Sequence, residues 1–234
     1  TTPIFGNVLM YDSWTVFLRE LLLLFAILFT AFTQVAGVSN QDDMTEFYVL
    51  VLGALVGMCL MISANHILIV MLGIEMASVP SYVLAGIQRQ RPKSSEASLK
   101  YAVFGAGAAG IMFYGASLLV GVLGTAHLPT MATRLAELLQ NGGSPDHAMV
   151  LVLGGLMLMV GVAFKLSAFP FHFWAPDVFE GALAEVAAFL SIASKAAALG
   201  LLVRLAIGFS FSTNAAHLAA LEPVRHYIVM LVGL

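Results

Sequence analysis

Long apolar runs are the feature that most constrains this chain. Of its 234 residues, 60% are hydrophobic and 10% are charged, a balance that a water-soluble domain of this size does not expose. A helix needs about 20 apolar residues to cross the hydrocarbon core of a bilayer. We therefore predict an all-α membrane protein, a polytopic bundle of transmembrane helices. The predicted spans are residues 14–37, 46–63, 65–88, 97–124, 148–169, a segment from about 170 to 183, 185–208, and a further start near 223.

Basic residues between the spans predict the orientation of the bundle. The segment 88–100 carries four basic residues and one acidic residue, whereas the loop 125–147 carries one basic and two acidic residues. Cytoplasmic loops of membrane proteins are enriched in Lys and Arg. We therefore predict that segment 88–100 faces the cytoplasm. By alternation, the 38–45 loop is also cytoplasmic and the 125–147 loop lies outside.

The ionisable side chains of Glu75, Lys165 and Lys195 lie inside the apolar runs. A charge near the bilayer centre costs at least roughly 2.5 kcal/mol, so such residues mark ion or proton routes. We interpret all three as candidate proton-translocation residues. Pro80, five residues beyond Glu75, is expected to break the helix and to free a backbone carbonyl that holds water beside the acid. The plainer alternatives are a structural ion pair between Glu75 and one lysine, and lysines that extend to the headgroups.

Two further prolines predict a helix break. Pro170 and Pro176 cannot donate backbone hydrogen bonds, so we expect one discontinuous helix near 148–183 with Lys165 beside the break. Broken helices at membrane depth line cavities. The break is therefore expected to give Lys165 access to water.

More polar residues flank this predicted break. Lys100 is a candidate for proton entry, or equally an interfacial anchor. His172 is a candidate proton shuttle because the ordinary pKa of histidine lies near 6.5. A purely structural role for this histidine is an equal alternative. The candidates for relay or gating are His172, Asp177, Glu180 and Glu185.

Several other kinds of site find no support. Cys59 is the only cysteine, and no spacing of His, Cys, Asp or Glu matches a metal motif, so we expect no metal or cofactor in this chain. The net charge of -3 forms no basic stripe, which argues against nucleic acid as a partner. A G-x-G-x-x-G match at 105–110 lies inside an apolar run with no preceding strand. We interpret the small residues Gly53/Gly57 and Ala102/Ala106/Gly110 as helix-packing surfaces.

Specific strings resemble the antiporter-like, proton-translocating membrane subunits of respiratory complex I, and most closely the subunit N group of the bacterial enzyme. The similarity runs over nearly the whole chain from about Tyr11. The matching strings are EFYVLVL at 46–52, ANHILIVMLGIEMASVPSYVLAG at 64–86, SSEASLKY at 94–101, FKLSAFPFHFWAPDVFEGA at 164–182 and ASK at 193–195.

The resemblance implies roles for four residues of this chain in proton translocation: Glu75, Lys165, Lys195 and Lys100. It also implies two five-helix repeats of inverted topology, each with one discontinuous helix, and no redox cofactor in the chain itself. NADH, FMN, iron–sulfur clusters and quinone would belong to partner subunits. The expected partners are other complex I membrane subunits, including adjacent antiporter-like ones, and the lipid bilayer, which in bacteria is the inner membrane.

The same resemblance divides the chain into three parts. Residues 1–45 would form an N-terminal transmembrane helix and loop, 46–208 one five-helix antiporter-like repeat, and 209–234 a loop with the truncated start of a further helix. On this resemblance, we expect the second repeat to lie outside the 234 residues of this chain. The family usually has prolines where this chain has Leu183 and Glu185, and we predict that Glu185 is a loop residue of secondary importance.

The favoured hypothesis is a proton-translocating subunit of a complex I-type NADH:quinone oxidoreductase, driven by redox reactions in other subunits. The chain would then be part of an enzyme without itself carrying electrons. One alternative is a subunit of a multisubunit monovalent cation/proton antiporter or a membrane hydrogenase. Another is a scaffold subunit whose charges form only structural ion pairs.

Overall fold

The computed structural model describes residues 2–36, 44–140 and 145–208, together with 219, 221–223, 226 and 230. Most of the expected 38–45 loop and of the expected helix from 223 therefore lies outside the described residues. Within them, six helices are long and apolar enough to span a membrane. The predicted all-α membrane fold is confirmed. The six are α1 (Ser13–Ala36), α2 (Met44–Ser63), α3 (Ile67–Ala85), α4 (Pro92–Leu123), α6 (Pro145–Leu166) and the continuous run Ala184–Gly208.

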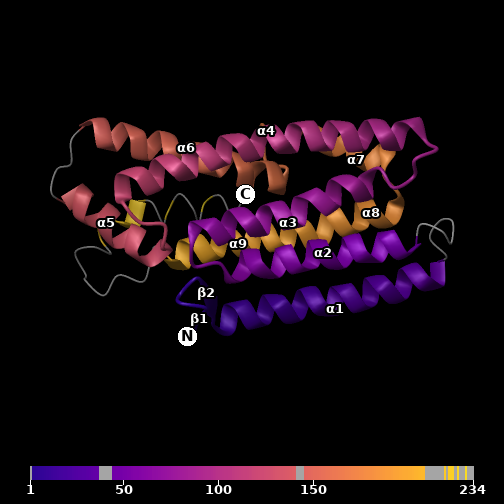
Figure 1. Cartoon of the computed structure of the whole chain (residues 1–234), viewed down its shortest axis with the longest axis horizontal. Helices are drawn as coiled ribbons and strands as arrows, with labels where there is room; N and C mark the ends of the chain where they lie inside the picture. Colours follow the sequence, from indigo (N-terminus) through magenta and orange to yellow (C-terminus); the bar gives the residue numbers. More distant parts are fainter. Residues whose placement is uncertain are drawn as a thin grey trace.

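The last of these runs is not a uniform α-helix. It begins as α8 (Ala184–Phe189), passes through a π-helical turn, η2 (Leu190–Ser194), and continues as α9 (Lys195–Gly208). Figure 1 shows α1 along one edge of the bundle, beside α2, and α4 along the opposite edge. Helices α6 and α7 (Trp174–Gly181) follow one another along α4, as two halves of the predicted discontinuous helix.

Two short elements were not expected from the sequence. Strands β1 (Thr2–Ile4) and β2 (Leu9–Tyr11) form an antiparallel hairpin before α1. Helix α5 (Leu128–Gln140) lies in the segment predicted as the 125–147 loop. Its buried residues Leu128, Met131, Ala132 and Ala136 follow helical spacing. A search for long apolar runs misses such a helix because its other face is polar.

The hairpin, the α2–α3 turn and α5 meet at one end of the bundle. Asn65, in the turn predicted at 63–66, donates from its side-chain nitrogen to the Asn7 carbonyl at 2.9 Å and lies 3.0 Å from Nε2 of His127. Burial and the neighbouring His66 lower the pKa of His127, which favours a neutral ring able to accept from Asn65. The histidines here therefore hold loops together.

Small residues allow close helix packing at some of the predicted positions and not at others. A Cβ on Gly57 would lie 2.4 Å from the backbone nitrogen of Ala77, so α2 and α3 can approach closely only with glycine there. The packing role of Gly57 is confirmed. Gly110 is exposed and makes no such close contact among the described residues, because a Cβ there would meet no described atom within 4 Å.

A buried arginine ties three elements together at the same end of the bundle. Arg204, on α9, is 1% exposed. Its Nη1 and Nη2 donate to the two carboxylate oxygens of Asp12 at 2.6 and 2.7 Å, and its Nε donates to the Ile62 carbonyl at 3.0 Å. Thr15 accepts a further hydrogen bond from Nη2. These hydrogen bonds from Arg204 hold the pKa of Asp12 well below its ordinary value of 3.8.

We expect Asp12→Asn to destabilise the chain by about 3 kcal/mol, because it leaves a buried guanidinium without its counter-charge. Thermal unfolding in detergent measures the loss. Since the pKa of Asp12 is lowered in the folded state, the ion pair contributes fully above the ordinary value of 3.8 and is lost only as the pH falls from there towards the lower folded value.

The matched control is Glu46→Gln, which breaks the exposed pair between Glu46 and Arg89, whose side chains are 60% and 78% exposed. It should cost less than about 1 kcal/mol. Equal losses in the two variants would contradict the structural role given to Arg204.

Candidate functional site

Lys165 lies in the last turn of α6, the first half of the broken helix, directly before the break. Helix α6 ends at Leu166, and Ser167 adopts a left-handed conformation with φ of 58°. The Lys165 side chain is 4% exposed, and its Nζ donates to the Ser78 hydroxyl on α3 at 2.9 Å. The lysine is therefore removed from solvent and bonded to a neutral partner.

The predicted break is confirmed between Leu166 and Trp174. Pro170 lies within it and follows a cis peptide bond. Pro176 does not lie at the break, and this prediction was wrong. Pro176 occupies the first turn of α7, where proline is tolerated because those N–H groups have no helical acceptor.

Aromatic side chains hold the two halves of the broken helix in place. The Trp174 indole on α7 donates to the Phe164 carbonyl on α6 at 3.1 Å. That carbonyl belongs to the last turn of α6, where helical donors run out. The Trp174 ring also stacks on Tyr101 of α4, with centroids 4.4 Å apart and planes at 7°. Trp174 thus fixes the residue immediately before Lys165.

Glu75 lies on α3 one turn before Ser78. Its Oε1 is buried and has no hydrogen-bond partner in the described chain. Lys165 is near enough to interact with it electrostatically, yet no ion pair within 4.0 Å joins Glu75 to a lysine among the described residues. The helix break predicted at Pro80 is wrong, because Pro80 lies inside α3, which continues past it to Ala85. A direct structural ion pair, the plainer interpretation, does not form.

Lys195 is the first residue of α9 and directly follows the π-helical turn. Its side chain is half-buried. The ammonium lies 5.8 Å from the centroid of the Phe179 ring on α7, within the range of a cation–π contact. π-Helical turns occur frequently at functional sites. The expected companion of Lys165 therefore faces the outer half of the broken helix.

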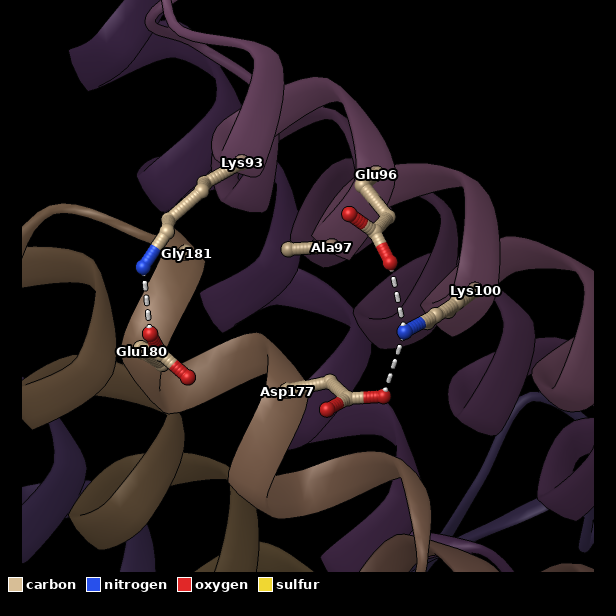
Figure 2. A pocket seen from close by; sticks show the side chains of 7 residues that line it. All are labelled: Lys93, Glu96, Ala97, Lys100, Asp177, Glu180 and Gly181. Atoms are coloured by element: carbon tan, nitrogen blue, oxygen red, sulfur yellow. Dashed lines mark hydrogen bonds and ion pairs between the residues drawn. The ribbon is translucent and has the colours of Figure 1, made fainter.

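Figure 2 shows where α4 and α7 bring the other charged candidates together. Lys100 Nζ lies 2.7 Å from Glu96 and 2.8 Å from Asp177, and Lys93 Nζ lies 2.6 Å from Glu180. We call this cleft of about 90 Å³ the charged cleft. Its lining residues are Lys93, Glu96, Ala97, Lys100, Asp177, Glu180 and Gly181.

Two predicted relay residues lie elsewhere. His172 is exposed and stacks against Phe169 with ring centroids 5.8 Å apart. Glu185 is not a loop residue as predicted, because it occupies the first turn of α8, where a carboxylate is favoured by the helix dipole. No ion pair between Glu185 and Lys195 occurs among the described residues. Of the four relay candidates, Asp177 pairs with Lys100, and Glu180 lies in the same charged cleft, where it pairs with Lys93.

Three contributors to the site were not found from the sequence: Ser78, Trp174 and Tyr101. The signal for Ser78 was present, since it follows Glu75 by three residues and so shares its helix face. The aromatic pair gave no such signal. Within the described residues, no three His, Cys, Asp or Glu side chains gather in a way that could hold a metal ion.

A family model described as "NADH:quinone oxidoreductase/Mrp antiporter, TM" matches residues 64–223. The chain belongs to this family. The match includes Glu75, Lys165 and Lys195, so the broken helix and its charges lie in the part of the chain that defines membership.

Proteins of similar sequence agree with this family assignment. NADH-quinone oxidoreductase subunit N of Rhodospirillum rubrum is 41% identical over 204 residues, covering 87% of this chain and 41% of that protein. The Nitrosomonas europaea subunit N is 42% identical over 163 residues, covering 70% of this chain and 33% of that protein. The chain thus spans less than half the length of these relatives.

Solved structures give the same fold. A chain of respiratory complex I from Thermus thermophilus, with bound aureothin, matches with a TM-score of 0.67 and 31% identity, covering 94% of this chain and 50% of that chain. A chain of an archaeal membrane-bound sulfane sulfur reductase matches with a TM-score of 0.62 and 19% identity, covering 94% and 48%. The second match shows the fold alone.

Helices α4 and α7 pack closely at the charged cleft. A Cβ on Gly181 would lie 2.5 Å from the Lys93 carbonyl oxygen and 2.6 Å from the Ala97 Cβ. Gly181→Ala should therefore push α7 from α4 and cost about 1–3 kcal/mol, measured by thermal unfolding in detergent.

Gly155→Ala on α6 is the matched control, because a Cβ there would meet no described atom within 4 Å. It should be neutral or slightly stabilising, since alanine favours helix more than glycine does. A Gly181→Ala variant as stable as this control would contradict the close α4–α7 packing.

Proposed function

We propose that this chain is part of a proton-translocating membrane subunit of a complex I-type NADH:quinone oxidoreductase. Glu75, Lys165 and Lys195 would carry protons along an intramembrane axis, driven by redox reactions in other subunits. The observation that carries the proposal is the burial of Lys165 beside the helix break. A buried lysine bonded only to a hydroxyl costs stability that a purely structural role does not repay.

The arrangement of the other charges supports the same proposal. Glu75 is close enough to Lys165 to influence it without forming a direct pair, so proton transfer on one residue changes the field at the other. Lys195 faces the outer half of the broken helix. A proton would pass from Lys165 through water to Lys195 and then to the part of the subunit beyond this chain.

The charged cleft is the proposed cytoplasmic approach to this axis. Lys100 is 37% exposed at the side chain and bound to two carboxylates, which favours a role at the surface over one in the buried axis. Asp177 and Glu180 would hold water and local protons at the same place. In this proposal segment 88–100 faces the cytoplasm of a bacterial inner membrane, and the cofactors and quinone belong to partner subunits.

The same proposal divides the chain into three parts. Residues 46–208 would form one five-helix repeat with its broken helix, preceded by an N-terminal helix in 1–45, and 209–234 would lead to the second repeat. Partner membrane subunits, including adjacent antiporter-like ones, would complete the path.

A second candidate is a subunit of a multisubunit cation/proton antiporter, because the matching family model includes Mrp antiporters by description. Sodium-dependent proton exchange by vesicles would favour it, whereas co-purification with quinone-reductase subunits favours complex I. A pure scaffold is less well supported, since it would need the charges to be satisfied by direct structural pairs.

Lys165→Met in the assembled complex should remove most proton pumping, because it deletes the buried proton carrier and keeps the side-chain volume. The measurement is the number of protons moved per NADH oxidised in sealed vesicles. Arg89→Met is the matched control, since it removes a cation that is 78% exposed and lies outside both the proposed axis and the charged cleft. The control should pump at the native ratio.

Assembly has to be measured alongside pumping in both variants. A Lys165→Met complex that assembles normally and keeps the native proton-to-electron ratio would refute the proposed function. Loss of assembly in Glu75→Gln without a pumping defect in the remaining complex would instead favour the scaffold.

A further inference from the structure

Ser78 is the only described side chain that hydrogen bonds to Lys165, and it does so from a buried position. Ser78 is 4% exposed and Lys165 is also 4% exposed. Nζ of Lys165 donates to the Ser78 oxygen at 2.9 Å, while the Ser78 hydroxyl donates to the Ile74 carbonyl at 2.6 Å. The serine therefore stands between the lysine and the backbone of the helix that carries Glu75.

A row of polar residues on α3 gives this serine its setting. Glu75, Ser78 and Tyr82 are spaced by three and four residues, so they share one face of the helix. The Tyr82 phenol interacts with Ser78. Tyr82 also accounts for the glycine at position 105 on α4, because a Cβ on Gly105 would lie 2.1 Å from the Tyr82 phenol oxygen. The helix thus presents a polar face to Lys165 in an otherwise apolar bundle.

A hydroxyl partner has a property that a carboxylate partner lacks. A lysine ammonium only donates hydrogen bonds, whereas the neutral amine has a lone pair that accepts one. An ionised carboxylate can only accept, so it serves the charged lysine alone. A serine hydroxyl both donates and accepts, so it can stay bonded to the lysine in either protonation state.

The switch between the two states costs the backbone little. When the hydroxyl turns from the Ile74 carbonyl to the lysine nitrogen, that carbonyl keeps its helical bond from the Ser78 backbone N–H, because α3 is helical on both sides. The lysine is therefore held at one place throughout its protonation cycle, and both the Ser78 hydroxyl and the Ile74 carbonyl keep a hydrogen-bond partner in each state.

We propose that Ser78 is a positioning residue for proton transfer at Lys165, which it holds in both the charged and the neutral form. The inference rests on the proposed function. When Lys165 gives its proton to water, one N–H bond breaks and one O–H bond forms on the water, leaving hydronium and a neutral amine. The Ser78 hydroxyl then rotates and donates to that amine. No covalent bond to Ser78 changes.

The test compares three variants in the assembled complex by NADH-driven pumping in sealed vesicles. Ser78→Ala should lower the pumping rate by about tenfold or more, as expected for loss of a hydrogen bond to a charged group. Ser78→Thr keeps the hydroxyl and should restore most of the rate. Neither should reduce the amount of assembled complex by a comparable factor.

Ser81→Ala is the matched control. Ser81 lies on the same helix, is fully buried, and donates to the Ala77 carbonyl at 2.6 Å in the same way as Ser78 does to Ile74. No described hydrogen bond joins it to Lys165. Its loss should leave pumping at the native rate.

The outcomes separate this inference from the proposed function. Native pumping by Ser78→Ala, together with failure of Lys165→Met, overturns the inference and leaves the function standing. Equal defects in Ser78→Ala and Ser81→Ala, or no rescue by an assembled Ser78→Thr complex, also overturn it. Native pumping by Lys165→Met overturns both.

Discussion

The structure depends on keeping one lysine out of water inside a bundle of apolar helices. Lys165 loses the solvation of bulk water, and a charge at bilayer depth costs at least roughly 2.5 kcal/mol. The fold compensates through position: the lysine lies at the end of α6, where the helix stops, and it bonds to a buried hydroxyl. The other residues of the site lie around this buried lysine.

Breaking a helix at that depth creates a second requirement, because freed carbonyls need donors. Trp174 meets part of it by donating to Phe164 and by stacking on Tyr101. The outer half of the broken helix is then held on α4 by the ion pairs of the charged cleft and by close packing at Gly181. An irregular segment is thus confined between two ordered ones, with Lys165 at its inner end and Asp177 beyond its outer end.

Much of this could be predicted from residue patterns, and the exceptions have physical reasons. Apolar runs predicted the spanning helices closely because backbone in lipid must be helical, and Pro170 predicted the break. Pro176 misled because proline is harmless in a first turn, and α5 was missed because it is amphipathic. Arg204 and Trp174 were missed because tertiary packing brings them to their partners, Asp12 and Phe164, and no local sequence pattern predicts such contacts.

The most direct measurement is the density around Glu75 in an experimental map of the assembled complex, at a resolution that shows ordered water. We expect water bonded to the buried Glu75 Oε1 and leading towards Lys165, because that oxygen has no donor within the described chain. We also expect Lys165 to keep its bond to Ser78. A dry, direct ion pair between Glu75 and Lys165 would contradict proton transfer through water and leave the charges as structural features.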